Sequence, residues 1–486
     1  MHLSCPRTLA TSAYGTVISA TKARTGPTFN SILSNRKLWT AASCSHPDLA
    51  TALSQCLPVS SSSTQPSTSS SHGKDDVTIV LASRSYPGSD LLSLPSKIPS
   101  HISQSSIVLG AVVDRVPTKS GHGVSTLRLK SDPSSPTAAG QKISCKPFYL
   151  SGAESRRKRL KEKSVGKWAR SQDIEERSLD TADAWAAFKS ISVGHNQVQV
   201  PEAVLPSHHL SSTPTSTSQD IVMISDLEVH QFLEALDNAI PEANKIGLLA
   251  SSTPFITGRA VTMFYDGKII QDGVLGVSVI RNIKDSNSGE SKISVDYPSL
   301  APLGPAMQIT RCRGNIILEL DESNATRLLL DQLKSTTLTK DKEYFLATSE
   351  SVIPTQSQDV NVDMSKATVY KITGGDPSKG NMAVDTVHDL NVGQWVQFIH
   401  HHNVQKHGHF DPSHTPEAKQ GLVRFTATDP NNTIEEHLRK NQQDINSQEL
   451  TQALFGGSSE NGFIVGQPNK HTWVCNVADS VMKRTV

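Results

Sequence analysis

The stretch DIVMISDLEVHQFLEALDNAIPEANKIGLLA, residues 220–250, decides the expected fold. Residues 220–225 and 245–250 are short apolar, β-branched runs, which are typical of buried strands. Between them, apolar side chains recur at helical spacing at Phe232, Leu233, Leu236 and Ile240. Asp226 stands where a helix N-cap is expected. Strand, helix and strand in this order predict a sheet with a helix packed on it.

A similar order of elements occurs earlier in the chain. Residues 77–83 and 106–113 are again short apolar runs, and residues 123–129 alternate apolar and polar side chains as a half-exposed strand does. Later, Asp266-Gly267 predicts a tight hairpin turn between 259–265 and 268–270. The sequence therefore predicts an α/β protein of mixed β-sheets covered by helices, with one strand–helix–strand–hairpin unit present twice.

Composition limits the class of protein. Apolar residues and glycine together make up roughly 42% of the 486 residues, below the roughly 45–50% that compact domains use. We therefore expect long disordered insertions, at residues 60–76 and 150–219. The 47 basic and 46 acidic residues nearly cancel, which disfavours nucleic acid as a partner. No apolar run approaches the roughly 20 residues of a membrane span, and no cofactor motif is present.

The amino-terminal residues resemble an import sequence. The first 47 residues contain no Asp or Glu, and they combine basic side chains with many hydroxyl groups. This composition is typical of mitochondrial targeting segments, so a leader over residues 1–47 and a mitochondrial location are expected. The cytoplasm and the nucleus remain alternatives, the latter because residues 156–163 form a basic cluster.

Two segments resemble a known family. Residues 244–255 lead into the hairpin and Gly273–Ser278, and residues 302–321 carry the order PLGP, TR, GN and ELD. Together they resemble FIST domains, a sensory module that some eukaryotic proteins join to an F-box. Weaker similarities suggest the companion FIST C-terminal domain, at 367–372, 391–398 and 455–463. The resemblance implies a FIST N-terminal-like domain at 48–320, a FIST C-terminal-like domain at 321–467 and a tail at 468–486.

The resemblance also implies a function. FIST proteins are expected to be non-catalytic sensors of small ligands, with amino acids or related metabolites as the expected class. The sensor interpretation requires residues 220–335 to fold as one compact unit. The alternative is an adaptor or scaffold with a protein partner in ubiquitin-dependent degradation, although no F-box is visible in the sequence. No constellation for a hydrolase is evident, so an enzyme is not expected.

Candidate ligand-binding residues come from three segments. Ser251 and Ser252 directly follow a predicted strand, where open α/β sheets place their ligands. Hydroxyl groups there can equally cap the segment that follows. A Gly-rich turn offers backbone amides, a hydroxyl group and a carboxylate, and a strand arginine offers a bidentate partner for a ligand carboxylate. These candidates are Gly457, Ser458, Glu460 and Arg311.

A histidine-rich segment follows residue 398. Its imidazoles at short spacing make His400, His402, His407 and His409 candidates for zinc, nickel or copper. The spacing matches no established zinc motif, and a polar loop without metal is the competing interpretation.

Overall fold

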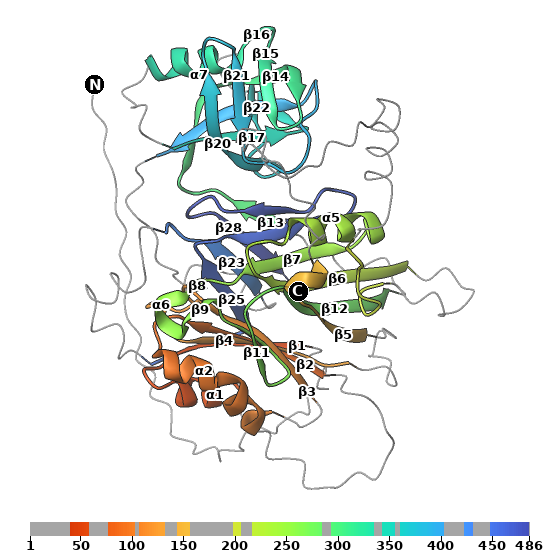
Figure 1. The fold of residues 1–486 in the computed structure, drawn as a ribbon, viewed down its shortest axis with the longest axis vertical. Helices are drawn as coiled ribbons and strands as arrows, with labels where there is room; N and C mark the ends of the chain where they lie inside the picture. Colours follow the sequence, from red (N-terminus) through yellow and green to blue (C-terminus); the bar gives the residue numbers. More distant parts are fainter. Residues whose placement is uncertain are drawn as a thin grey trace, which may run out of the picture. The chain divides into compact units, whose positions relative to one another are not determined.

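Two β-sheets with matching strand order form the centre of the computed structural model (Figure 1). The structure describes residues 39–57, 76–102, 106–131, 143–155, 198–205, 216–283, 293–334, 343–354, 360–402, 422–430 and 448–485. The expected basic cluster at 156–163 lies outside these ranges, as do His407 and His409. None of the helices in the described part has the length and apolar character of a membrane span.

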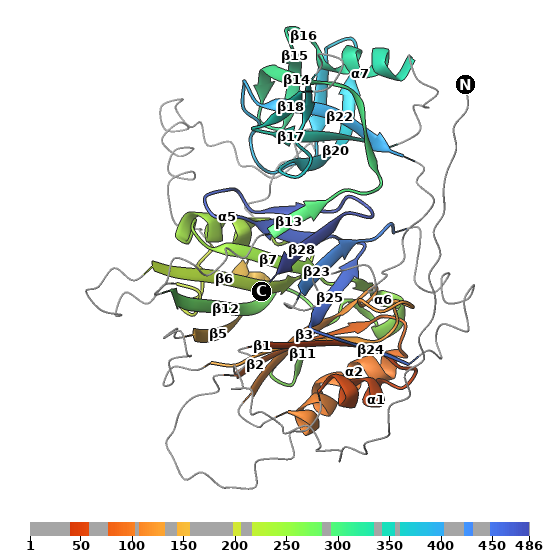
Figure 2. The ribbon, with the colours of Figure 1, turned by 180° about the vertical axis from the view of Figure 1, so that it is seen from behind.

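The first sheet contains the amino-terminal strand–helix–strand unit. Its strands are, in order across the sheet, β11 (Lys268–Ile270), β10 (Met263–Tyr265), β3 (Ser106–Val113), β2 (Asp76–Ser83), β4 (Val124–Leu129), β1 (Trp39–Ser45) and β24 (Glu449–Gln452). The pair β2 and β3 is parallel and the other pairs are antiparallel. Strand β1 lies inside the expected leader, so a removable leader cannot extend beyond residue 38 without taking a strand. Figure 2 shows β24 beside β1.

The second sheet repeats this arrangement. Its strands are, in order, β27 (Trp473–Cys475), β26 (Phe463–Gly466), β7 (Asn244–Leu249), β6 (Ser216–Ser225), β12 (Val274–Ile283) and β5 (Ile143–Leu150). Again the strands on either side of the helix, β6 and β7, are parallel, and antiparallel strands flank them. The predicted repeat of strand, helix and strand is therefore present in both sheets, but the hairpin is not repeated. The hairpin after β7 differs, because β10 and β11 join the first sheet.

Helices are few in this strand-rich fold. Helices α1 (Leu49–Cys56) and α2 (Gly88–Lys97), with the 3₁₀ turn Ile98–His101, pack against one face of the first sheet. Helix α5 (His230–Ala239) packs on the second. The remaining face of each central sheet belongs to one shared apolar cluster, which includes Ile79, Leu81, Ile246 and Leu248. The mixed α/β class is therefore confirmed, but helices cover only one face of each central sheet, because the other face packs on a neighbouring sheet.

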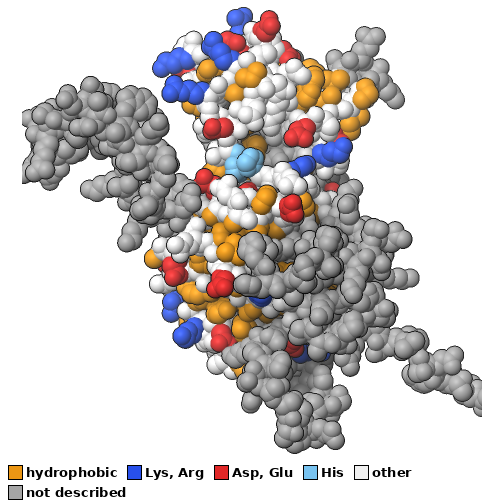
Figure 3. Space-filling view, turned by 90° about the vertical axis from the view of Figure 1, so that its right-hand side faces the viewer, with side chains coloured by type: hydrophobic (Ala, Val, Ile, Leu, Met, Phe, Trp, Pro, Cys, Tyr) orange, Lys and Arg blue, Asp and Glu red, His pale blue; other side chains and the backbone are white. Residues whose placement is uncertain are grey.

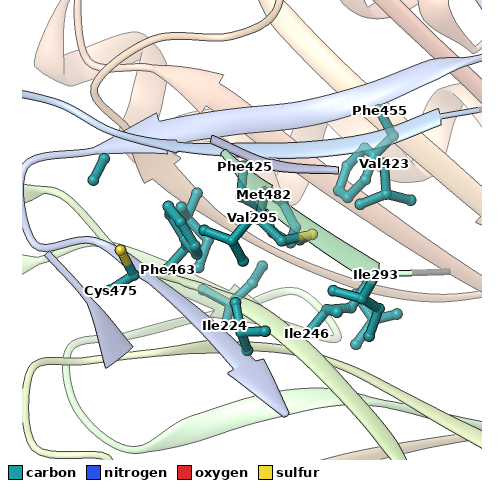
Figure 4. Close-up of a cluster of buried hydrophobic side chains, with 14 of the residues drawn as sticks. Ile224, Ile246, Ile293, Val295, Val423, Phe425, Phe455, Phe463, Cys475 and Met482 are labelled. Carbon is teal, nitrogen blue, oxygen red and sulfur yellow. The ribbon is translucent and has the colours of Figure 1, made fainter. Parts of the chain in front are cut away.

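A third sheet adds the carboxyl-terminal strands to this core. It consists of β13 (Ile293–Asp296), β28 (Val481–Thr485), β23 (Leu422–Ala427) and β25 (Leu454–Ser459). Figure 4 shows Val295, Phe425 and Met482 from this sheet beside Ile224 and Phe463 from the second. The expected tail at 468–486 thus contains two strands, β27, which pairs with β26, and β28, which pairs with β13 and β23.

A fourth sheet is formed by residues 300–401. Its strands are, in order, β14 (Leu300–Arg313), β22 (Trp395–His401), β17 (Tyr344–Ser349), β20 (Thr368–Asp376), β21 (Asn381–Val384), β15 (Ile316–Leu320) and β16 (Ser323–Asn324), with α7 (Ala325–Lys334) packed on it. Residues 220–335 therefore do not form one unit but divide between this sheet and the others. The condition set for the sensor interpretation is not met, so a ligand site has to be sought where strands of several sheets meet. The expected boundary at 320/321 falls between β15 and β16, which pair.

Short elements complete the described chain, and local predictions can be compared with them. They are α3 (Gly152–Ser155), β8 (Ser252–Thr253), α6 (Pro254–Thr257), β9 (Arg259–Val261), β18 (Val352–Pro354) and β19 (Val360–Val362). The predicted turn at Asp266-Gly267 is confirmed, and a second turn at Gly314-Asn315 joins β14 to β15. The N-cap role of Asp226 is wrong: α5 begins at His230, and the Asp226 carboxylate accepts the backbone N–H of Gly273 at 2.7 Å.

Candidate functional site

Strands from three sheets end close together, and polar residues follow those ends. Arg84 comes directly after β2, Asp114 and Arg115 after β3, Ser251 and Ser252 after β7, and Glu460 after β25. Ser458 lies near the end of β25. We call these seven residues the strand-end cluster. The carboxyl ends of parallel strands are the usual location of ligand sites in α/β sheets.

Strand β25 connects the third sheet to the first at this point. The backbone N–H of Asp114 donates to the Ser458 carbonyl at 2.8 Å, and the Ser458 N–H donates to the Arg115 carbonyl at 2.8 Å. A Cβ atom on Gly457 would lie 3.1 Å from Leu81 Cδ1 and 3.2 Å from Leu248 Cδ2. The glycine therefore lets β25 pass between side chains of the two central sheets and so places Ser458 and Glu460.

A buried ion-pair network forms the base of the strand-end cluster. Asp114 is 1% exposed, and its carboxylate lies 2.9 Å from Arg84 Nη2 and 3.3 Å from Arg115 Nε. Burial raises the pKa of the Asp114 carboxyl, while Arg84 and Arg115 oppose this and Glu460 adds to it. Both arginines are also largely buried. With Glu460, the network holds two cations and two carboxylates, so its formal charge is balanced.

Glu460 joins this network to the second sheet. Its Oε1 accepts the backbone N–H of Ser252 at 2.7 Å and lies 3.5 Å from Arg84 Nη1. The next residue, Asn461, donates from its side chain to the Ala250 carbonyl at 2.8 Å. These contacts fix the segment after β7 against the segment after β25. Ser251 is buried, and its hydroxyl donates to Ser459 Oγ at 3.4 Å.

Several polar atoms of the strand-end cluster have unused hydrogen-bonding capacity. Within the described residues, Glu460 Oε2, Ser458 Oγ and Arg84 Nε are buried and have no hydrogen-bond partner. Leaving a buried polar group unsatisfied costs about 1–3 kcal/mol. Three such atoms from two strand ends, those of β2 and β25, therefore point to a place where another polar molecule completes the bonding.

The structure brings together four of the predicted site residues, namely Ser251, Ser252, Ser458 and Glu460. It places Gly457 among leucines, as described above. It does not bring Arg311 to the strand-end cluster: this residue is on β14, its side chain is 62% exposed, and it pairs with Glu319 on β15. Its expected ligand-binding role has no support from this position.

The histidine candidates lie elsewhere. His400 Nδ1 is 2.9 Å from the His401 carbonyl oxygen, and His402 is exposed beyond the end of β22. Among the described residues, no group of three or more His, Cys, Asp or Glu side chains could hold a metal ion. Both signs of charge occur on the described part of the face drawn in Figure 3.

Sequence reasoning missed Arg84, Asp114 and Arg115. The signal was available, because Arg84 directly follows the predicted strand 77–83, and Asp114 and Arg115 directly follow 106–113. The strand-end argument that selected Ser251 applies to them equally. The ion-pair network could not be predicted, because it depends on which strand ends meet, and the segments that carry Arg84, Asp114 and Glu460 are separate in the sequence.

Comparison with known proteins gives one match. The family model of the FIST N domain matches residues 140–323, a span that includes β5 to β7 and β12 and contains Ser251, Ser252 and Arg311. FIST domains are generally sensory, ligand-binding domains. The match gives no support for a FIST C-terminal domain at 321–467 or for a relation to F-box proteins. Neither a curated protein nor a solved structure matches the chain.

Proposed function

We propose that this chain is a sensory protein that binds a small polar ligand at the strand-end cluster. The observation that carries the proposal is the group of buried atoms with unused hydrogen-bonding capacity at Glu460, Ser458 and Arg84. The FIST N domain match over 140–323 supports the same class of function. The roles in ubiquitin-dependent degradation and in mitochondria stay predictions.

An amino acid or related metabolite fits the chemistry of the cluster. A ligand ammonium group would donate to Glu460 Oε2, and a ligand carboxylate would accept from Arg84 Nε and Ser458 Oγ. Hydrogen bonds that involve charged groups contribute about 1.5–3 kcal/mol each, more than neutral ones. A zwitterion also leaves the formal charge of the network balanced, so its binding does not bury an uncompensated charge.

Binding at Glu460 would act on the segment that follows β7. Ser252 donates its backbone N–H to Glu460 Oε1, and the chain continues directly into the short helix α6. A ligand that binds better when this contact is formed would favour the conformation that contains it, as in any shift between conformational states. We propose that a partner protein recognises the conformation in which the Ser252–Glu460 contact is formed.

Thermal denaturation in the presence of each of the twenty amino acids tests the proposal. We expect saturable stabilisation by one chemical class, about 2.7 kcal/mol at a ligand concentration one hundred times Kd. Glu460→Gln should weaken the effect at least tenfold in Kd, because it removes the charge that faces the ligand ammonium group. Arg311→Gln is the matched control, because its side chain is exposed and paired elsewhere. Absence of stabilisation by every amino acid, or equal affinity in Glu460→Gln, would contradict the proposal.

A further inference from the structure

A second polar group at the end of β2 contains a serine in contact with a histidine. Ser85 Oγ lies 2.5 Å from His122 Nδ1, and His122 Nε2 lies 3.0 Å from the carbonyl oxygen of His46. A carbonyl oxygen only accepts hydrogen bonds, so Nε2 carries the proton of the neutral ring. Nδ1 is then the basic nitrogen, and the Ser85 hydroxyl donates to it.

The imidazole is held in this orientation from several sides. The Tyr86 ring packs against it with 4.3 Å between ring centroids, and the Tyr86 hydroxyl donates to the same His46 carbonyl at 2.8 Å. The backbone of His122 is also fixed, because its N–H donates to Ser120 Oγ and its carbonyl accepts from Thr118 Oγ1. A base with an oriented ring and a bonded hydroxyl is the arrangement that activates nucleophilic serines.

The exposure of Ser85 and the pKa of His122 also fit an activated serine with a histidine base. His122 is 4% exposed, whereas Ser85 is partly accessible to solvent. Burial lowers the pKa of the His122 imidazole below its ordinary 6.5; the bond to the His46 carbonyl opposes this, and the His46 side chain adds to the lowering. The ring is therefore neutral at pH 7 and able to accept a proton.

A further hydroxyl group faces the Ser85 oxygen. Ser83 Oγ lies 2.6 Å from Ser85 Oγ and accepts the Ser85 N–H at 3.3 Å. When Ser85 donates to His122, the Ser83 hydroxyl is oriented to donate to Ser85 Oγ. This donor would stabilise the negative charge that develops on the Ser85 oxygen as its proton leaves.

We propose that Ser85 is a nucleophile, activated by His122, that accepts an acyl group from an activated ester or thioester. The Ser85 Oγ–carbon bond forms, and the carbon–oxygen or carbon–sulfur bond to the leaving group breaks. The hydroxyl proton passes to His122 Nδ1 and then to the leaving alcohol or thiol. No oxidant or reductant is needed. This site is separate from the strand-end cluster, and its reactivity does not depend on the ligand proposed there.

Acetylation by p-nitrophenyl acetate tests the proposal on the whole chain. Release of p-nitrophenolate is followed by absorbance, and the acetyl group is located by peptide mass spectrometry. We expect acetylation of Ser85 at least tenfold faster than that of Ser93, whose hydroxyl donates to the Asp90 carbonyl at 2.8 Å. Ser85→Ala should remove the fast phase, and the matched control Ser93→Ala should retain it. Absence of acetyl on Ser85, or a rate no higher than that of Ser93, would overturn the proposal.

The pH profile of the unaltered chain is a second readout and needs no buried substitution. The rate of Ser85 acetylation should rise as the imidazole loses its proton, with a midpoint below pH 6.5, and stay level between pH 7 and 8. A serine that reacts without a base would instead accelerate about tenfold per pH unit over that range, and this result would overturn the role of His122. His122→Gln should slow acetylation about 100-fold or more, the usual contribution of a general base.

Discussion

Replacing Asp220 by alanine should destabilise the protein strongly. Asp220 lies in β6 with its side chain 4% exposed, and its Oδ2 lies 2.9 Å from Arg281 Nη2. Its Oδ1 accepts from Asn244 Nδ2 at 2.9 Å and forms an ion pair with Arg484 of β28. One carboxylate on β6 thus connects its neighbours β7 and β12 in the second sheet with β28 of the third.

The magnitude follows from the burial of the partners. Arg484 is 2% exposed, so loss of the carboxylate removes from a buried guanidinium the anion that lies against it. Breaking a buried pair on one side costs about 3–5 kcal/mol. The matched control is Asp331→Asn, which removes the ion pair between Asp331 and Lys334. The Asp331 side chain is 50% exposed and that of Lys334 is 74% exposed. Pairs of this kind contribute about 0–1 kcal/mol.

The effect should also depend on pH. Burial alone would raise the pKa of Asp220, but Arg484 and Arg281 together with hydrogen bonds hold it below the ordinary value of 3.8. Because the pKa is lower in the folded state than in the unfolded state, the stability from this group is present above about pH 4 and is lost as the pH falls through the folded value. The difference between the unaltered chain and Asp220→Ala should therefore shrink below pH 4.

Urea unfolding, followed by circular dichroism and tryptophan fluorescence, measures both effects. We expect a lower midpoint for Asp220→Ala with an unchanged slope, and a midpoint close to that of the unaltered chain for Asp331→Asn. A loss in Asp220→Ala no larger than that in Asp331→Asn would refute the reasoning. A loss that stays constant between pH 7 and pH 3 would refute the electrostatic cause.

Three further predictions concern packing and local structure. Gly456→Ala should lower the free energy of unfolding in urea by about 1–3 kcal/mol or more, because the new Cβ would lie 1.9 Å from a backbone oxygen of β23. Its control is Gly374→Ala, which should be near neutral because the new Cβ meets nothing within 4 Å. Asp226→Ala should cost about 1–3 kcal/mol in the same assay, because two backbone N–H groups lose their acceptor; an unchanged midpoint would contradict this. Deletion of residues 1–47 removes β1 and should give a much lower melting temperature than deletion of residues 1–38, which leaves β1 in place; equal melting of the two variants would refute the role of β1.

Much of the local structure could be predicted from the sequence. The apolar runs at 220–225 and 245–250 became β6 and β7, and Phe232, Leu233 and Leu236 became the buried face of α5. The pairing of distant segments could not be predicted, because no local pattern encodes it. Strand β24 pairs with β1 across most of the length of the chain, and β26 pairs with β7 across nearly half of it.

The candidate site was predictable only in part, for the same reason. Ser252 was recognisable from its place after a predicted strand and Glu460 from the polar groups of a Gly-rich turn, but their contact depends on how β25 runs between the central sheets. The position of Arg311 could not be derived by alternation, because the β14 pairings shift register near Met307 and again at Arg311. Each shift can change the face to which later side chains point.

The ion pair between Asp220 and Arg484 has a consequence for biosynthesis. The ribosome makes β6 long before β28, so the nascent chain carries a carboxylate whose main cation has not yet been translated. Until then only Arg281 of β12 is available to pair with this carboxylate. We therefore expect the second sheet to stay incompletely packed during that interval rather than bury Asp220 with one of its two arginines. Completion of the central layers would then wait for the last strand, and such a delay leaves apolar segments accessible to chaperones during translation.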